Sequence, residues 1–350
     1  MIREKISYFG IFESDLDLLI ENNPSQLYNF QDKTITIFGG TGFVGKWLTA
    51  SLINADQKLD LNLNLRLFTR NKKQLLVNLR NSSTNKYEIV EVDFAKSNPI
   101  DIQSSDYYFH LATSSSIKTG SNLEKNVYES TVNVINQTVK NLSPSTNAPV
   151  FIHASSGAVY GEALSSKGLI EEKPSVIISN KNSLYCNSKV TAENLIDKYS
   201  RNLLIKGMNP RLFAFAGPHL ALDEHFAIGN FVLNAVRGED IIVKGNPETV
   251  RSYMYPTDLI NWLVRLALEP STSYMNFGSD SPITIDELSK IIKDFNQSKG
   301  IKYIAMNSKF TSYVPSTINA RKHLNISEII PLSTSIDKWM KWLRMSQQYL

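Results

Sequence analysis

Residues 34–45 of the chain read TITIFGGTGFVG, and this stretch decides the fold. Five residues that favour a β-strand run directly into a glycine-rich turn, and the residues that follow are typical of a helix. Glycines in this pattern allow a tight turn, bring a pyrophosphate close to backbone N–H groups, and let the helix pack closely on the strand. A glycine string alone is a weak signal, so the strand-turn-helix context is what indicates a dinucleotide-binding loop. The residues expected to bind the cofactor here are Gly39, Thr41, Gly42, Phe43, Val44 and Gly45.

From Lys33 onward, the chain alternates short β-branched apolar runs with longer amphipathic runs. This alternation predicts an α/β fold, a doubly wound parallel sheet of the Rossmann type. The expected strands are 34–38, 63–69, 87–92, 107–111, 150–155 and 203–215. The expected helices between them are 43–55, 71–80, 122–142 and 183–200.

The sequence divides into three expected parts. Residues 1–32 form an N-terminal appendage, with a short helix at 14–20 that Ser14 is expected to cap. Residues 33–217 form the dinucleotide-binding domain, and 218–350 form a smaller α/β C-terminal lobe that binds substrate and is partly interleaved with it. In that lobe the rhythm is irregular, with strands expected at 241–243 and 274–277 and helices at 257–269 and 284–296.

Composition excludes several classes of function. The 350 residues are 42% hydrophobic and 20% charged, as in ordinary globular proteins, and the net charge of +4 forms no basic block that would follow nucleic acid. Cys186 is the one cysteine, so no internal disulfide or thiolate zinc site is possible, and no two histidines are spaced for a metal. The N-terminus lacks a signal-peptide pattern, and no apolar run approaches the roughly 18 residues of a membrane span. We therefore expect a cytoplasmic protein without a metal, a nucleic acid or a membrane as partner.

Two residues at strand ends bear on the choice of cofactor. Arg70 follows the second expected strand, where an enzyme that prefers NAD usually places an acidic residue. An arginine there can pair with the 2′-phosphate of NADP, so NADP is favoured and NAD is the alternative. The other interpretation makes Arg70 a solvated residue at a helix start. Asp93, which ends the third strand, is placed either to meet the adenine or to form a simple turn.

A serine, a tyrosine and a lysine form the candidate reaction centre. Residues 151–161 read FIHASSGAVYG, and Tyr185 and Lys189 stand four apart in an expected helix, on one face. A lysine ammonium beside a phenol favours the phenolate and can bind the nicotinamide ribose, while the hydroxyl of Ser156 orients a reacting carbonyl or alcohol. Tyr160 is the rival phenol, but no lysine follows it at four residues. Cys186 is interpreted as a packing residue rather than a nucleophile.

Together these motifs resemble the NAD-dependent epimerase/dehydratase family of extended short-chain dehydrogenases, over about residues 33–345. The resemblance includes the segments 110–113 (HLAT), 210–218 (PRLFAFAGP), 250–259 (VRSYMYPTDL) and 274–279 (YMNFGS). It implies that Leu111, Ala112 and Thr113 line the cofactor site. It also implies that Ser114, Ser156, Gly157 and Arg251 bind the substrate, with Arg251 clamping a nucleotide diphosphate. The alternative for Arg251 is an ordinary surface arginine.

Three departures from the family pattern restrict the expected chemistry. In the resembling 4,6-dehydratases an aspartate and a glutamate follow the catalytic hydroxyl residue, where this chain has Gly157 and Ala158. The related sugar-acid decarboxylases keep the glutamate, so Ala158 also argues against decarboxylation. Ala214 replaces an asparagine that often contacts the substrate.

The sequence therefore leads to the hypothesis of a homodimeric, NADP-dependent enzyme of polysaccharide biosynthesis that reduces a 4-keto nucleotide sugar. A nucleotide-sugar 4-epimerase is the alternative, because an epimerase returns its hydride and needs no net reductant. A third possibility, of another class, is a non-catalytic dinucleotide sensor. Such sensors generally lose the catalytic tyrosine or lysine, whereas this chain has both Tyr185 and Lys189.

Overall fold

The computed structural model of the chain describes residues 5–79, 87–96, 100–112, 121–165, 168–174, 177–179, 183–222, 226–271, 274–295, 299–304 and 309–346. The chain forms two compact units. Unit 1 comprises Met1–Gly161, Pro174–Arg211 and Ile260–Met275, and unit 2 comprises Glu162–Lys173, Leu212–Leu259 and Asn276–Leu350. The domain boundaries expected from the sequence stay a prediction. No helix in the described ranges combines the length and the apolar character needed to cross a membrane.

Unit 1 contains a six-stranded parallel sheet with the strand order β3-β2-β1-β4-β5-β7. Its strands are β1 (Thr34–Phe38), β2 (Asn64–Thr69), β3 (Tyr87–Glu91), β4 (Tyr107–His110), β5 (Val150–His153) and β7 (Lys206–Met208). The order reverses direction at β1, because the chain first adds β2 and β3 on one side and then β4 on the other. This confirms the predicted doubly wound α/β sheet, and it places the switch point beside the glycine-rich turn.

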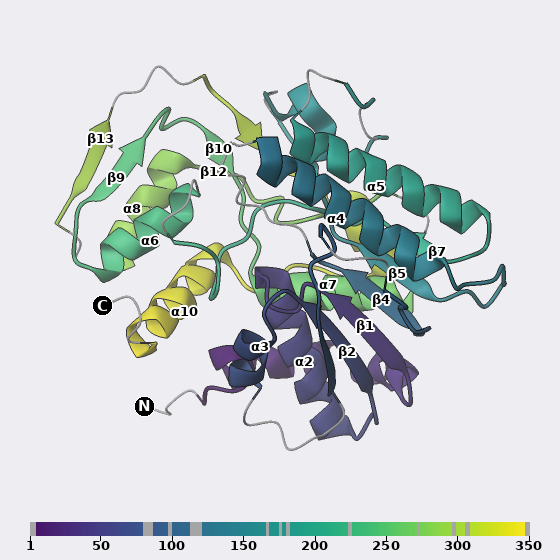
Figure 1. Cartoon of the computed structure of the whole chain (residues 1–350). Helices are drawn as coiled ribbons and strands as arrows, with labels where there is room; N and C mark the ends of the chain where they lie inside the picture. Colours follow the sequence, from purple (N-terminus) through teal and green to yellow (C-terminus); the bar gives the residue numbers. More distant parts are fainter. Residues whose placement is uncertain are drawn as a thin grey trace. The chain divides into compact units, whose positions relative to one another are not determined.

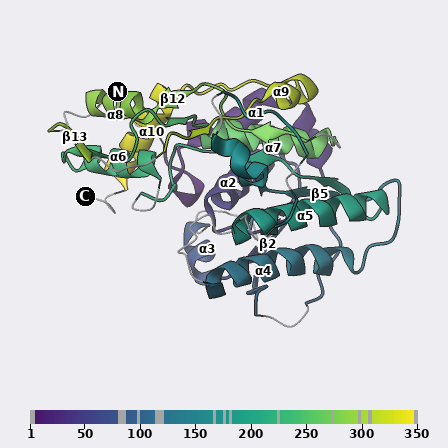
Figure 2. The ribbon, with the colours of Figure 1, turned by 90° about the horizontal axis from the view of Figure 1, so that it is seen from above.

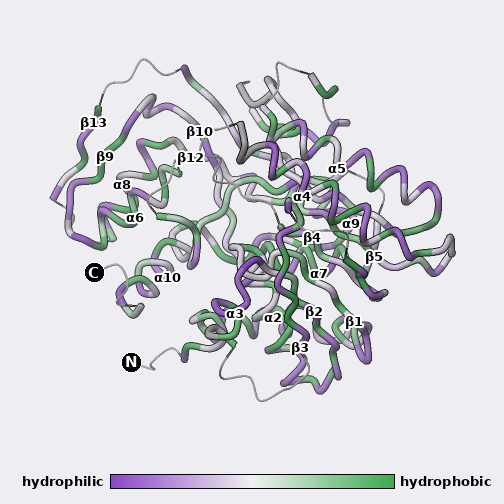
Figure 3. Tube along the Cα trace, in the orientation of Figure 1, coloured by the Kyte–Doolittle hydropathy of each residue, from purple (hydrophilic) through white to green (hydrophobic). Residues whose placement is uncertain are grey.

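Helices cover both faces of this sheet. Helices α4 (Ser121–Val139) and α5 (Leu184–Arg201) lie on one face, where their side chains pack on Phe38, Tyr108 and Phe151 (Figures 1 and 2). Helix α2 (Phe43–Leu59) and the unit 1 part of α7 (Pro256–Leu268) lie on the other face. Figure 3 shows hydrophilic and hydrophobic positions alternating along α5, as expected for a helix with one face on the sheet. The short helix α3 (Lys72–Asn78) follows β2.

The N-terminal segment of unit 1 forms a further layer of that unit. It has 3-10 turns at Tyr8–Gly10 and Gln26–Phe30 on either side of α1 (Glu13–Asn22). Asn23 donates to the Asn261 side chain at 3.0 Å in a buried contact. The expected cap at Ser14 is wrong, because α1 begins at Glu13 after Phe12. Phe12 is fully buried, so its anchoring in the core sets where the helix begins.

The single strand expected at 203–215 is interrupted. It consists of β7 and of β8 (Arg211–Leu212), with Asn209 and Pro210 between them. Proline has no N–H group to continue a ladder, so the prediction of one continuous strand is wrong at this point. The Pro210 carbonyl instead accepts from the Ser155 N–H at 2.9 Å.

Unit 2 is a smaller assembly of helices and short strands. Strand β9 (Ile241–Lys244) pairs in parallel with β13 (Ile301–Ile304), and β10 (Val250–Arg251) lies between β12 (Ile283–Thr284) and β14 (Ser312–Tyr313). Its further elements are α6 (Ala227–Val236), β11 (Asn276–Phe277), α8 (Ile285–Phe295), α9 (Ile318–Leu324) and α10 (Leu332–Met345). The boundary between the units falls within α7. The sequence patterns did not predict α6, α9, α10 and β13.

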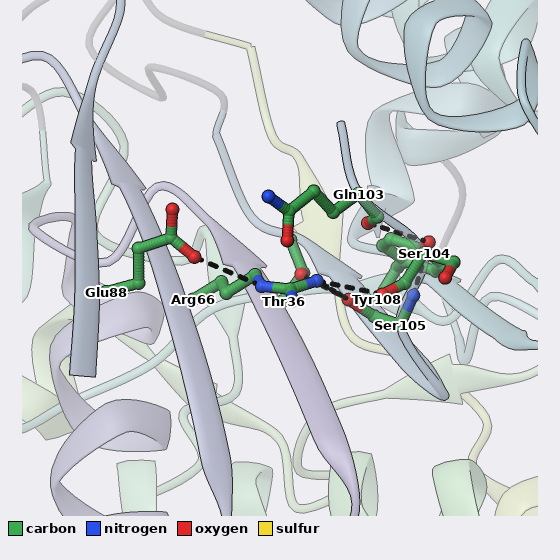
Figure 4. Close-up of polar contacts among 7 residues, drawn as sticks. All are labelled: Thr36, Arg66, Glu88, Gln103, Ser104, Ser105 and Tyr108. Carbon is green, nitrogen blue, oxygen red and sulfur yellow. Dashed lines mark hydrogen bonds and ion pairs between the residues drawn. The ribbon is translucent and has the colours of Figure 1, made fainter. Parts of the chain in front are cut away.

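A polar cluster ties the strands of unit 1 together near the start of β4 (Figure 4). The Arg66 guanidinium of β2 lies between Glu88 of β3, at 3.1 Å, and the Ser104 carbonyl, at 2.8 Å. The Ser105 hydroxyl pairs with that of Thr36 on β1 at 2.7 Å. Because Ser104 and Ser105 precede β4, this cluster lies at the amino end of that strand. It does not occupy the carboxyl ends of the strands of this sheet.

Two histidines are paired inside the sheet. His110 and His153 are register partners on β4 and β5, both are fully buried, and their Nδ1 atoms are 3.0 Å apart. Burial lowers the pKa of His110 to about 3 and that of His153 well below its ordinary value, and the positive charge of Lys189 acts in the same direction. One Nδ1 must donate and the other accept, so both rings are neutral in the folded chain.

We predict that the chain loses stability as the pH falls below the ordinary histidine pKa of 6.5. A depressed folded-state pKa means that the unfolded chain binds the proton first, so acid favours unfolding. For His110 alone, the free energy of unfolding should fall by about 1.4 kcal/mol between pH 7.5 and 5.5, and His153 should add to this. Denaturant titrations at several pH values measure it. His110→Asn, which keeps a polar atom facing His153, should weaken the pH dependence, whereas His323→Gln at an exposed position should not. An unaltered pH dependence in His110→Asn would contradict the prediction.

Candidate functional site

The glycine-rich turn lies at the carboxyl end of β1 and leaves no room for a side chain at two of its glycines. Gly39 has φ +91°, and a Cβ there would lie 2.8 Å from the Cα of Ala112. A Cβ at Gly45 would lie 2.1 Å from the Gly39 carbonyl oxygen. The Leu111 N–H donates to the Phe38 carbonyl at 2.9 Å, which holds the segment after β4 beside the turn. Glycine at 39 and 45 is therefore needed for the packing of strand, turn and helix.

The amino end of α2 fits the pyrophosphate of a dinucleotide. Gly42 is the N-cap and is exposed, and because it has no side chain it cannot cap the first amides of the helix. Phe43 and Val44 form the first turn, so their N–H groups belong to the positive end of the helix dipole. The Thr41 hydroxyl lies 3.1 Å from that of Thr69, at the end of β2. These residues suit a nicotinamide dinucleotide, as the sequence predicts.

The other residues expected near the cofactor are placed as follows. Arg70 directly follows β2 and is exposed. The Asp93 carboxylate accepts from the Ala95 N–H at 3.1 Å, which is the turn role that the sequence left open. Leu111 and Ala112 adjoin the glycine turn, whereas Thr113 and Ser114 lie outside the described residues.

Ser156 and Tyr185 are brought together in unit 1. Ser156 lies on β6 (Ser155–Ser156), just beyond β5, and its hydroxyl accepts from the Ala158 N–H at 3.2 Å. Tyr185 lies in the first turn of α5, which Ser183 caps by accepting from the Cys186 N–H at 3.1 Å. Burial raises the pKa of Tyr185, and the nearby Ser156 hydroxyl, which acts in the opposite direction, offsets this only in part.

Lys189 lies one helical turn beyond Tyr185 and is buried. Its Nζ donates to the Ala154 carbonyl at 2.5 Å and lies 5.8 Å from the centroid of the Tyr185 ring. Burial lowers the Lys189 pKa to about 7, against the opposing charge of Glu193. The pKa of Tyr185 is thus raised rather than lowered overall, because burial opposes charge on both the tyrosine and the lysine. The contribution of Lys189 to the phenol pKa stays a prediction.

The rival candidates in the same region have other contacts. The Tyr160 hydroxyl accepts from Arg211 Nη1 at 2.9 Å, and the side chain is buried. Cys186 is buried, and burial raises its pKa, which disfavours the reactive thiolate. These contacts favour Tyr185 over Tyr160 as the proton carrier.

Glu193 and Arg211 belong to the site but were not among the residues expected from the sequence. Glu193 Oε1 accepts from the Ser155 hydroxyl at 2.7 Å and from Arg211 Nε at 2.9 Å, while Oε2 accepts from Arg211 Nη2 at 2.7 Å. A signal did exist, since Glu193 follows Lys189 by four residues, just as Lys189 follows Tyr185. Nothing in the sequence paired it with Arg211.

Arg251 belongs to unit 2 and is held by the strand beside it. Its Nη1 donates to the carbonyls of Val250 at 2.8 Å and Thr311 at 3.2 Å, and its Nη2 to the Thr311 hydroxyl at 3.0 Å. Burial lowers its pKa. Gly157, the other expected substrate contact, follows β6 and is buried. The substrate roles of both residues stay predictions.

Comparisons with known proteins agree with this geometry. The model of the NAD dependent epimerase/dehydratase family matches residues 35–277. UDP-glucuronic acid decarboxylase 3 of Arabidopsis thaliana is 27% identical over 293 residues, which are 81% of this chain and 81% of that protein. UDP-glucuronic acid decarboxylase 1 of the same plant is 27% identical over 261 residues, or 74% of this chain, and the chain spans only 58% of that protein.

Solved structures share the fold. An epimerase from Methanothermobacter thermautotrophicus has a TM-score of 0.77 at 17% identity, and the match covers 95% of this chain and 96% of that one. UDP-glucose 4-epimerase from Thermotoga maritima, solved with UDP-glucose, has a TM-score of 0.72 at 17% identity, covering 90% of this chain and 100% of that one.

We predict that Gly45→Ala destabilises the chain, because the added Cβ would overlap the Gly39 carbonyl. Overpacking of this kind costs about 1 to 3 kcal/mol of unfolding free energy, and it should also displace the turn and weaken nicotinamide-dinucleotide binding. Thermal unfolding and a binding titration measure the two effects. Gly40→Ala is the matched control, since its Cβ would lie 3.7 Å from the Thr49 Oγ1, an ordinary van der Waals contact. Equal behaviour of the two variants would refute the packing argument.

Proposed function

Since the chain belongs to the NAD-dependent epimerase/dehydratase family, a family of enzymes, we propose that it transfers a hydride between a nicotinamide cofactor and a carbon of a nucleotide-linked sugar. The observation that carries the proposal is that Ser156 lies close enough to Tyr185 to influence the pKa of its phenol, with Lys189 one turn further along α5 and 5.8 Å from the Tyr185 ring centroid. The glycine turn at the amino end of α2 supports the cofactor part of the proposal. The sugar part follows from the nucleotide-sugar relatives.

Each of the three residues has a distinct role in this proposal. Ser156 donates to the reacting oxygen and orients the carbonyl. Tyr185 gives its phenolic proton to that oxygen, the O–H bond of the phenol breaks, and solvent later restores the proton. Lys189 binds the nicotinamide ribose and, when charged, stabilises the phenolate. The bound nicotinamide supplies the hydride that adds to the carbonyl carbon.

We favour net reduction of a 4-keto nucleotide sugar with NADPH. Arg70, exposed at the end of β2, can pair with a 2′-phosphate, and NADPH suits net reduction. A 4-epimerase is the alternative, because it uses the same residues and returns the hydride to the sugar. Arg251 is proposed to hold the diphosphate of the substrate. A homodimeric state and a cytoplasmic location also belong to this proposal.

Decarboxylation is the competing reaction, because relatives at 27% identity are named UDP-glucuronic acid decarboxylases. The position two after Ser156 is Ala158, where the family resemblance leads us to expect a glutamate in such enzymes. A methyl group cannot exchange a proton. We therefore propose that this chain transfers a hydride without removing a carboxylate.

The test is an assay of products with three substrates. We predict that a 4-keto nucleotide sugar will oxidise NADPH stoichiometrically, as absorbance of the reduced nicotinamide measures. UDP-glucose with NAD should give no 4-epimer, and UDP-glucuronic acid should release no carbon dioxide. Epimer formation without net change of cofactor would establish the alternative, and carbon dioxide release would overturn the proposal in favour of decarboxylation. Tyr185→Phe should lower turnover by about 10² to 10⁴ and leave cofactor binding intact, because the phenolic proton is lost.

We predict that Arg70→Asp weakens NADPH binding much more than NADH binding. A charge-assisted contact with the 2′-phosphate is worth about 1.5 to 3 kcal/mol, or roughly a tenfold to hundredfold change in affinity. Calorimetric titrations with both cofactors measure the difference. Arg237→Asp, at another exposed arginine, is the matched control and should alter neither affinity. If the unmutated chain binds NADH and NADPH equally well, the preference assigned to Arg70 is wrong.

A further inference from the structure

Helix α5 carries Tyr185, Lys189 and Glu193 at intervals of four residues. This spacing places all three side chains on one face of the helix. The proposed function uses Tyr185 and Lys189. Glu193 is only 1% exposed, and a buried carboxylate is costly unless it is bound on several sides. The contacts of the Glu193 carboxylate therefore show which parts of the site it holds together.

Glu193 and Lys189 both bind the segment that leads to Ser156. Glu193 Oε1 accepts from the Ser155 hydroxyl at 2.7 Å, and Lys189 Nζ donates to the Ala154 carbonyl at 2.5 Å. Ala154 and Ser155 immediately precede Ser156. Two neighbouring residues are thus fastened to α5 at two points one helical turn apart, and the next residue is the one that meets Tyr185.

Arg211 holds Glu193 through both carboxylate oxygens, one of which also accepts from Ser155. The guanidinium contacts both carboxylate oxygens, through Nε at 2.9 Å and Nη2 at 2.7 Å, and both side chains are buried. Its Nη1 donates to the Tyr160 hydroxyl, and its Cζ lies 4.8 Å from the Tyr160 ring centroid and 4.4 Å from that of Tyr274. Such a fork, flanked by two aromatic rings, restricts the carboxylate to one orientation.

We propose that Glu193 is a positioning residue for hydride transfer: held by Arg211, it binds Ser155 and so keeps Ser156 in place against Tyr185. Its carboxylate also belongs to the same face of α5 as Lys189, one helical turn away, and supplies a negative charge there. The inference rests on the proposed function and goes beyond it, because it assigns a role to a residue to which the proposed function gives none. It has two separable parts, one that depends on a hydrogen bond and one that depends on charge.

The charge part follows from the surroundings of Lys189. Burial opposes its positive charge, and Glu193 is the group that favours it. The buried histidines His110 and His153 have lowered pKa values and are neutral, so they add no positive charge that would oppose the ammonium of Lys189. Removing the Glu193 carboxylate should therefore make Lys189 lose its proton at a lower pH, and the contact of an ammonium with the nicotinamide ribose would be lost with it.

The charge part is tested with NADH and NADPH alone as probes, by the fluorescence change on binding between pH 5 and 9. In the native chain the affinity should fall as the pH rises through the pKa of Lys189. Glu193→Gln keeps an acceptor for Ser155 but removes the charge, so the midpoint should move to lower pH by about one unit or more. Glu129→Gln, at a half-exposed carboxylate of α4 that pairs with Lys125 of the same helix, should leave the midpoint where it is.

The hydrogen-bond part is tested with Ser155→Ala, which leaves the Glu193 charge in place. The pH midpoint of cofactor binding should stay unchanged, and kcat on the substrate found by the product assay should fall about tenfold or more with KM nearly constant. A loss that reflected mere unfolding would instead lower cofactor binding and thermal stability together.

The outcomes separate the two proposals. If Glu193→Gln fails to fold because Arg211 is left as a buried unpaired charge, the double variant Glu193→Gln/Arg211→Met removes both charges and should still lower the midpoint. An unchanged midpoint in whichever of these folds, or a native kcat in Ser155→Ala, overturns the role of Glu193. Failure of the native chain to bind either NADH or NADPH overturns the proposed function itself.

Discussion

The buried ion pair between Glu193 and Arg211 is the interaction on which the arrangement of the site depends. It joins α5, which carries Tyr185 and Lys189, to the strand end at Arg211, and through Ser155 it also reaches the residue next to Ser156. Removing two charges from water is costly, and two charge-assisted hydrogen bonds offset that cost only while both partners are present. Loss of either partner would leave a charge in the core. The ion pair therefore maintains the placement of α5 relative to the strand at Arg211, because separating the two side chains would leave unpaired charges in the core.

Burial sets the electrostatics around this pair. The pKa of Lys189 is lowered to about 7, that of Tyr185 is raised, and the paired histidines behind them stay neutral. At neutral pH Lys189 is therefore close to a change of charge, whereas the phenol of Tyr185 keeps its proton. Any ligand that accepts a hydrogen bond from Lys189 Nζ favours its protonated form, so ligand binding and protonation are thermodynamically linked.

The fold itself does not select the reaction. Epimerases and decarboxylases both appear among the proteins that resemble this chain, and a sheet with a glycine turn serves all of them equally. In the proposed function the difference depends on single side chains near the carboxyl ends of the strands. Ala158 has no group that could exchange a proton, and Arg70 is a cation at the end of β2.

Local signals in the sequence placed the strands and helices of the parallel sheet and singled out the candidate site residues. The strand Thr34–Phe38 was placed at its observed ends, because a glycine turn ends it, and the four-residue spacing of Tyr185 and Lys189 put them on one helix face. The break at Pro210 was also visible in the sequence, but the apolar run around it outweighed it. The tertiary structure alone decided that Ser155 binds Glu193 and that Glu193 pairs with Arg211, 18 residues away. It also decided that the Tyr185 pKa is raised rather than lowered. Spacing along a chain fixes which side chains share a face, whereas burial and charge pairing depend on segments that only folding brings together.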